Sequence, residues 1–233
     1  FGRWLSLVPM VWPVLVGAEH WAFVPPRISP PPEVRDLSWV RNGIDRFVLA
    51  RFESEGIAPS PEASRSTLVR RLSLDLTGLP PSPDQALAFV QDDSPGAYSR
   101  FVERLLSSPH FGERQAQDWF DLARFADTSG YAADRTRNVW PYRDWVIAAF
   151  NDNLPFDQFS IDQLAGDLVS GATPEQRVAS AFHRHAMQAK GNNPRKEEFR
   201  IKGIVDRLEA TGRTWLGLTL ECAECRDHKH DPI

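Results

Sequence analysis

Two cysteines near the end of the chain are the residues best suited to do chemistry. Cys222 and Cys225 are the only cysteines among the 233 residues, and they stand three positions apart. This spacing can anchor a haem covalently, supply half of a metal site or close a reversible disulfide. Two such cysteines can also pack as small apolar residues in a core. The spacing alone leaves all four interpretations open.

The residues after the second cysteine bear on whether the pair could bind haem or zinc. In a c-type haem site a histidine directly after the second cysteine ligates the iron, and here that position is Arg226. Zinc needs four ligands, and the tail offers four: Cys222, Cys225, His228 and His230. The two histidines are, however, closer in sequence than those of zinc fingers. We expect these four residues to form a cofactor site that lacks the usual haem ligand or, alternatively, a zinc site.

Other polar residues could contribute to a site elsewhere. His183 and His185 lie near Met187 and could supply a distal haem ligand, or they could be ordinary surface or half-buried histidines. The segment from 127 to 137 could hold a polar site or form salt bridges between helices, through Asp127, Asp134, Arg135 and Arg137. Neighbouring arginines and aspartates predict pairs between helices: Arg124 and Asp127, Arg143 and Asp144, Asp206 and Arg207.

Composition excludes several classes of protein. The chain is 42% hydrophobic and 25% charged, which is typical of a globular protein and excludes a wholly disordered or fibrous one. Its 27 lysines and arginines against 31 acidic residues leave a net charge of -4, so we expect no nucleic-acid partner. The sequence has no glycine-rich phosphate loop, nucleophile elbow or metalloprotease helix, and we identify no catalytic residue.

The first residues resemble an export signal. The segment 1–18 is almost wholly apolar and ends in Val16-Gly17-Ala18, which suits cleavage after Ala18, although a buried helix or an anchor is the alternative. A proline-rich linker is expected over 19–37 and a helical domain over 38–233. We therefore expect an exported protein, periplasmic or at the cell surface. We also expect the given sequence to be a fragment that continues in a C-terminal part.

The hydrophobic periodicity predicts a mostly α multi-helix globular domain behind the linker. The expected helices lie near 38–56, 64–77, 83–92, 96–107, 111–127, 139–152, 156–168, 175–187 and 196–220. In the last of them one apolar stripe comprises Ile201, Ile204, Val205, Leu208, Thr211, Trp215 and Leu218. If this helix continues, Cys222 and Cys225 follow on the same face, as neighbours three apart do.

Several motifs in order resemble one family. They are His20-Trp21-Ala22-Phe23, the run Asp75 to Pro83, Ser107 to Arg114, Trp119 to Asp127, Tyr142 to Val146, Gln163 to Asp167, Thr214 to Thr219 and the tail from Cys222 to Ile233. Together they are similar to the planctomycete cytochrome-c-associated domain, an exported PSCyt-type domain of unknown function. The resemblance covers nearly the whole chain after the expected signal.

The resemblance implies haem c binding and electron transfer, with Cys222 and Cys225 as thioether anchors. It also implies a C-terminal partner domain in the full-length chain and association with the cell envelope, the redox partner being unknown. The chain departs from the family pattern at Arg226, which replaces the axial histidine, at His230, where an aromatic residue is usual, and at Gln115, where we expect tryptophan. The alternative is a noncatalytic cell-surface interaction or scaffold domain, with a disulfide or zinc at the cysteine pair.

Overall fold

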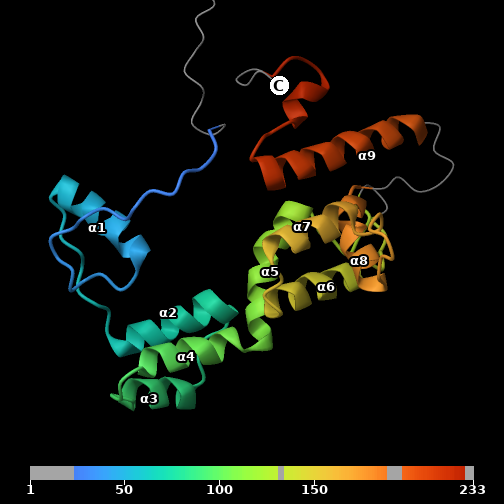
Figure 1. Ribbon diagram of the computed structural model, residues 1–233. Helices are drawn as coiled ribbons and strands as arrows, with labels where there is room; N and C mark the ends of the chain where they lie inside the picture. Colours follow the sequence, from blue (N-terminus) through green and yellow to red (C-terminus); the bar gives the residue numbers. More distant parts are fainter. Residues whose placement is uncertain (1–23, 131–133, 188–195, 229–233) are drawn as a thin grey trace, which may run out of the picture. The chain divides into compact units, whose positions relative to one another are not determined.

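The computed structural model describes residues 24–130, 134–187 and 196–228, and within them every regular element is a helix, as predicted (Figure 1). The α-helices are α1 (Gly43–Glu55), α2 (Arg65–Thr77), α3 (Pro83–Gln91), α4 (Ala97–Leu106), α5 (Pro109–Ala123), α6 (Trp140–Asn151), α7 (Phe156–Ala165), α8 (Pro174–Ala179) and α9 (Lys196–Thr211). The expected signal 1–18 lies outside the described residues. None of the described helices is long and apolar enough to cross a membrane.

The chain divides into two compact units, 1–62 and 63–233. The described part of the first unit is built around α1. Asn42 begins this helix, because its side chain accepts the N–H groups of Ile44 and Asp45 at 2.8 and 3.2 Å, and Gly56 ends it in the left-handed conformation. Ile44 is 73% exposed, and Leu49 is the buried residue of this helix.

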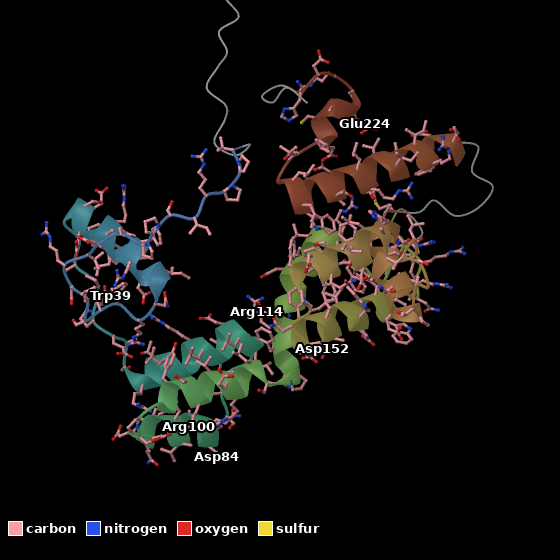
Figure 2. The ribbon with its side chains drawn as sticks, viewed as in Figure 1. Trp39, Asp84, Arg100, Arg114, Asp152 and Glu224 are labelled. Atoms are coloured by element: carbon pink, nitrogen blue, oxygen red, sulfur yellow. The ribbon has the colours of Figure 1, made fainter. Side chains whose placement is uncertain are left out.

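Helices α2, α3 and α4 form a small apolar cluster at the start of the second unit. Its buried members are Val69, Phe89, Phe101 and Leu105. Serine caps set the starts of α2 and α3, and the second is followed by a proline in the first turn, as the sequence predicts. Arg100, labelled in Figure 2, reaches from α4 to the carboxylate of Asp92 at 2.9 Å, which ties the start of α4 to the loop before it.

The main core of the second unit lies between α5, α6, α7 and the residues around 182 and 215. Trp119 is at its centre. The centroid of its ring lies 4.7 Å from that of Phe159 and 5.7 Å from that of Trp215, and both pairs are in edge-to-face geometry. The indole N–H of Trp119 lies 3.2 Å from the hydroxyl of Tyr142 and 3.1 Å from the side-chain oxygen of Gln163. Tyr142 donates to the same oxygen at 2.6 Å, so burial of these polar atoms is largely compensated.

Helices α5 and α6 cross closely at Gly112. A Cβ atom there would lie 2.4 Å from the carbonyl oxygen of Ile147 and 2.6 Å from the Cγ of Asn151. Instead, the N–H of Gly112 donates to Asn151 Oδ1 at 2.8 Å. The contact depends on glycine because no other residue leaves room for the carbonyl of the facing helix.

Two predicted helices are shorter than the periodicity suggests. The expected helix 175–187 is the α-helix α8 followed by a tighter 3₁₀ helix, η2 (Ser180–Arg184). The expected helix 196–220 is α-helical only to Thr211, and the prediction is wrong beyond Leu216. After Thr211 the chain forms a short π-helical turn, η3 (Gly212–Leu216), and Gly217 then stops it with φ of 65°.

Candidate functional site

The cysteine pair lies at a separate short helix. After Gly217 the chain continues to a 3₁₀ helix, η4 (Glu221–Glu224), which contains Cys222 and has Cys225 as the residue directly after it. The prediction that both thiols extend the apolar face of the preceding helix is therefore wrong. The cause is Gly217, whose left-handed backbone turns the chain away from the axis of α9.

The spacing of three residues still suits a 3₁₀ turn. In a 3₁₀ helix residues three apart eclipse one another, and their Cα atoms are about 6 Å apart at a rise of about 2 Å per residue. Both cysteines are free thiols and both are exposed, so the interpretation of two packed core residues is wrong. A Cα separation of about 6 Å also falls within the range that a disulfide can bridge.

Glu209 connects this short helix to α9. Its side chain is buried, and its Oε2 atom accepts the backbone N–H groups of Leu220 at 2.6 Å and Glu221 at 2.8 Å. Its other oxygen accepts from Arg213 at 2.6 Å. A carboxylate that satisfies two orphan N–H groups at a helix start fixes where that helix begins. Glu209 thus sets the position of the turn that carries the thiols.

The residues present do not fit a c-type haem. Cys222 and Cys225 could form thioethers, but the next side chain, Arg226, is a guanidinium that stays protonated and offers no lone pair to iron. It is exposed, as are Glu221, Glu224 and Asp227 around the thiols. A haem needs an apolar surface, and these neighbours are charged.

The predicted zinc ligands are only partly described. His228 is half-buried, and His230 lies outside the described residues. In the described ranges no three histidine, cysteine, aspartate or glutamate side chains gather as a metal site would require. The proposed zinc site at Cys222, Cys225, His228 and His230 therefore stays a prediction.

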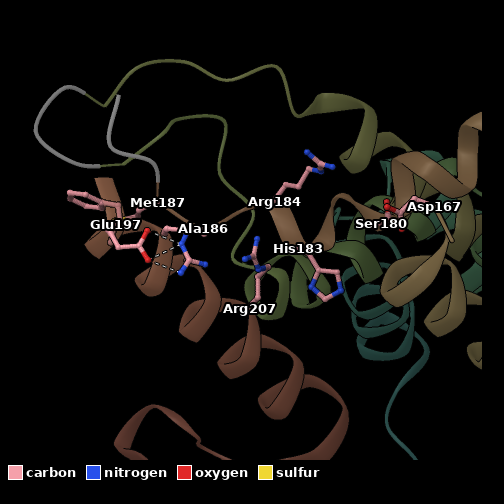
Figure 3. Close-up of a pocket in the computed structure, with 11 residues that line it drawn as sticks. Asp167, Ser180, His183, Arg184, Ala186, Met187, Glu197 and Arg207 are labelled. Atoms are coloured by element: carbon pink, nitrogen blue, oxygen red, sulfur yellow. Dashed lines mark hydrogen bonds and ion pairs between the residues drawn. The ribbon is translucent and has the colours of Figure 1, made fainter. Parts of the chain in front are cut away.

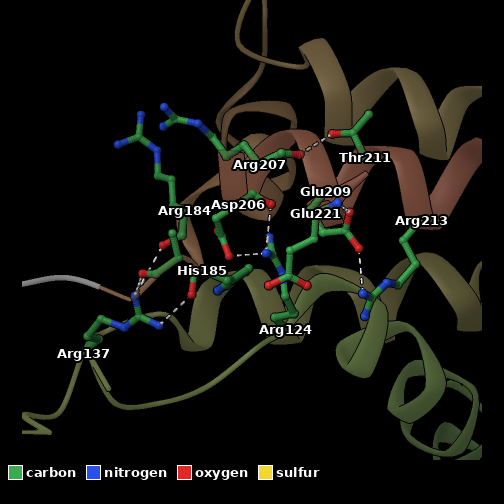
Figure 4. A network of polar contacts seen from close by, with 11 residues as sticks. Arg124, Arg137, Arg184, His185, Asp206, Arg207, Glu209, Thr211, Arg213 and Glu221 are labelled. Atoms are coloured by element: carbon green, nitrogen blue, oxygen red, sulfur yellow. Dashed lines mark hydrogen bonds and ion pairs between the residues drawn. The ribbon is translucent and has the colours of Figure 1, made fainter. Parts of the chain in front are cut away.

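A partly buried polar network lies along α9 (Figure 4). Arg124 follows α5 in a left-handed conformation, and its guanidinium binds both the carboxylate and the backbone oxygen of Asp206. The prediction that Arg124 pairs with Asp127 is therefore wrong. Burial raises the pKa of Asp206 above its usual range although Arg124 lowers it, so the cost of removing the carboxylate from water prevails. Arg143 does pair with Asp144, but the two are neighbours in α6, not partners across helices.

The segment after α5 is held by Arg137 rather than by salt bridges. The Arg137 guanidinium donates to the backbone oxygens of Arg184, His185 and Ala186 at 3.1 to 3.4 Å and of Ala126 at 3.4 Å. Asp134 accepts from the N–H of Gly130 at 2.9 Å within the loop itself. These contacts shape the loop, and they use backbone oxygens that sequence inspection does not reveal.

The structure places His183 and His185, the two candidate distal haem ligands, in different surroundings. His185 is 4% exposed and lies between aromatic rings, with Tyr142 at 4.6 Å and Phe125 at 5.5 Å. Burial, followed by the charges of Arg137 and Arg124, lowers the pKa of His185 to about 4, so its ring is neutral. His183 also has a lowered pKa, chiefly from burial, and it lines a pocket.

That pocket is the feature that sequence reasoning missed. It holds about 930 Å³ and lies between α9 and the segment 180–187, with His183, Arg184 and Arg207 on its walls (Figure 3). Arg184 and Arg207 are 23 positions apart in the sequence, and only the packing of η2 near α9 places them on one cavity. No local pattern of residues signals this arrangement.

Comparison with known proteins gives one match. The sequence model of PSCyt2, described as a protein of unknown function (DUF1549), matches residues 43–233. No curated protein and no solved structure matches the chain.

Proposed function

This chain belongs to the PSCyt2 family of unknown function, and we propose that it is a redox module of an exported protein that acts through Cys222 and Cys225. The observation that supports this proposal is the pair of exposed thiols on one short helix, held in place by Glu209. Exposure gives a partner access to both sulfurs, and a spacing of three residues at a 3₁₀ turn suits a disulfide between them.

The chemistry that suits such a pair is exchange with a disulfide of a partner protein or small molecule. One cysteine, as its thiolate, attacks a sulfur of the partner disulfide, which forms a mixed disulfide and releases one partner thiolate. The second cysteine attacks the mixed disulfide, closes the bond between Cys222 and Cys225 and releases the other partner thiolate. Two electrons pass to the partner, and the two protons lost by the domain end on the partner's thiols.

Arg226 separates this proposal from the haem-based role that the resemblance implies. With a guanidinium in the place of the axial ligand, the thiols lack the nitrogen donor that haem c requires beneath the iron. In this chain the thiols themselves, rather than an iron, would carry the electrons. The neighbouring charges of Glu221, Glu224 and Asp227 suit a surface exposed to water and do not suit a porphyrin.

The proposed location outside the cytoplasm rests on the sequence of residues 1–18. Thiol–disulfide chemistry of structural or catalytic kind is favoured in the periplasm and at the cell surface, which agrees with that location. Mass spectrometry of the exported full-length chain should find a new N-terminus at Glu19. Retention of residues 1–18 would contradict cleavage at this point.

A redox titration tests the proposed function. The protein is equilibrated with mixtures of reduced and oxidised glutathione, quenched with acid, alkylated and analysed by mass spectrometry. We expect an internal disulfide with a midpoint between about −270 and −120 mV, the range of disulfide oxidoreductases. Cys225→Ser should stop at a mixed disulfide with glutathione. Thiols that stay reduced, or that form only glutathione adducts in the unaltered protein, would overturn the proposal.

Haem is tested in a parallel experiment. The chain and its Arg226→His variant are expressed with a haem-maturation system, and covalent haem is measured by its absorption spectrum after acid-acetone extraction. We expect the unaltered chain to be free of haem and the variant to gain it. Stoichiometric haem in the unaltered chain would replace the thiol mechanism with a haem mechanism.

A second candidate function is that of a noncatalytic interaction or scaffold domain. It is supported by an exposed apolar stripe on α9, where Ile201, Ile204 and Leu208 are 48, 44 and 57% exposed. Large exposed apolar side chains in one row favour a protein partner. The candidate partner is a C-terminal domain of the full-length chain, and under the export proposal the two would meet at the cell envelope. Co-purification of that domain with this chain tests this function. We expect Ile204→Asp to abolish co-purification and Lys202→Asp, a control on the same helix, to leave it intact.

A further inference from the structure

The pocket between α9 and the segment 180–187 is separate from the thiol pair and has walls of opposite chemistry (Figure 3). One part is cationic and contains Arg184 from η2 and Arg207 from α9. Another part is apolar and contains Met187 and Phe199. Its volume of about 930 Å³ is within the range of small-molecule sites, about 300 to 1,000 Å³.

The two arginines of this pocket are available to a ligand. Within the part of the chain that the structure describes, neither Arg184 nor Arg207 has an acidic partner within ion-pair distance, and neither guanidinium has a hydrogen bond. A third arginine behaves differently. Two nitrogens of the Arg200 guanidinium donate to the carboxylate of Glu197 at 2.7 to 3.1 Å. Its charge is therefore already neutralised, and the unused positive charge belongs to the other two.

His183 adds a polar group to the same wall. Its Nδ1 atom is buried and has no hydrogen-bond partner among the described residues. The one uncompensated acid on the lining, Asp167, leaves the pair of arginines in excess.

We propose that this pocket binds a small organic anion, with a phosphate or carboxylate group between Arg184 and Arg207 and an apolar part against Met187 and Phe199. Guanidinium groups from two elements can each offer paired N–H donors to the oxygens of one anion. The fork geometry of arginine gives such a site its preference for oxyanions over chloride. The pocket adds a ligand site to a domain whose proposed chemistry lies at the cysteine turn.

Binding can be measured with the methyl groups of methionine as probes. The chain has two methionines, Met10 and Met187, and cleavage after Ala18 removes the first, so a methyl-labelled sample of the cleaved chain gives one methionine signal, from the pocket wall. The probes are inorganic phosphate, phenyl phosphate and phenylacetate, added at constant ionic strength against sodium chloride. We expect saturable shifts of the Met187 signal, with phenyl phosphate or phenylacetate binding at least tenfold more tightly than inorganic phosphate. The stronger of the two identifies the anionic group.

Variants distinguish a built site from nonspecific attraction. Arg184→Gln and Arg207→Gln should each weaken binding at least tenfold, whereas Arg177→Gln, at an exposed arginine of α8 outside the pocket, should leave it unchanged. Gly203→Leu keeps both arginines and fills the cavity, since a Cβ at Gly203 meets nothing within 4 Å, and it should also abolish binding. Equal binding by all variants, or no saturable shift with any probe, would overturn the proposal.

Discussion

The carboxylate of Glu209 accepts the backbone N–H of Leu220 at 2.6 Å, across a turn that reverses the chain after α9. The bond joins a buried side chain to the start of the helix that carries the thiols. Because an ionised acceptor strengthens such a bond, it fixes the geometry of the cysteine turn more firmly than a neutral bond would. The apolar core and the reactive end of the chain are thus connected through one acidic residue.

Removal of this carboxylate should release the cysteine turn. In Glu209→Ala the N–H groups of Leu220 and Glu221 lose their acceptor, so we expect their hydrogen exchange to accelerate at least tenfold, since charged hydrogen bonds contribute about 1.5 to 3 kcal/mol. Glu209→Gln keeps an oxygen and should give a smaller effect. Glu103→Gln, at an exposed residue of α4, is the control. Unchanged exchange in Glu209→Ala would show that other contacts hold the turn.

The crossing of α5 and α6 should tolerate no side chain at Gly112. Gly112→Ala places a Cβ 2.4 Å from a backbone oxygen that cannot move without displacing α6, so we expect a loss of about 3 kcal/mol or more of unfolding free energy. The matched control is Gly203→Ala in α9, where the Cβ meets nothing within 4 Å. That variant should gain about 0.5 to 1 kcal/mol, because alanine favours a helix over glycine. Urea denaturation measures both, and equal stabilities would contradict the close crossing.

His185 should make stability depend on pH below neutrality. The folded protein holds the pKa of His185 at about 4, against 6.5 for an ordinary histidine, so between these values the unfolded chain binds a proton that the folded protein excludes. The free energy of unfolding therefore falls as the pH falls from 6.5 to 4, by up to about 3 kcal/mol, and this contribution is fully present above pH 6.5.

His185→Phe tests this origin. Phenylalanine keeps a ring between Phe125 and Tyr142 but binds no proton. When the free energy of unfolding, measured by thermal unfolding, is plotted against pH between 4 and 6.5, its slope should therefore be smaller in this variant. A slope that persists in His185→Phe would assign the pH dependence to other groups.

Both thiols should react in the folded protein. Because Cys222 and Cys225 are exposed, a thiol reagent added without denaturant should modify two groups per reduced chain, at the rate found in urea. Cys222→Ser and Cys225→Ser should each give one. Reaction that requires urea would show that the thiols are covered in solution.

The sequence predicts most of the helices, because their starts carry local signals. Ser82 before Pro83 and Thr173 before Pro174 form caps whose hydrogen bonds involve residues only three positions away. The end of α9 is not visible in this way. The apolar stripe continues through Trp215, and only the left-handed backbone at Gly217 shows where the helical path stops.

The inner face of α9 also differs from the predicted one. Ile204 and Leu208 are exposed, whereas Glu209 and Ala210 are buried, because the Glu209 carboxylate finds two N–H donors beyond the helix and so can leave water. Likewise, the partner of Arg124 is Asp206, 82 positions away, and not the nearby Asp127. Pairs and pockets of this kind depend on the packed fold, so the cysteine spacing was accessible from the sequence and the arginine pocket was not.

The position of Trp215 in the core has a consequence for synthesis of the chain. Trp215 packs against Trp119 and Phe182, so the main core lacks one wall until the ribosome has added the residues up to 215. At about 5 to 20 residues per second, that wall arrives roughly 5 to 20 s after Trp119 itself. During this interval Trp119 and Phe182 lack their ring contacts with Trp215, so this side of the core stays open to water. The order of synthesis thus makes completion of the core a late event, which depends on a residue 96 positions after Trp119.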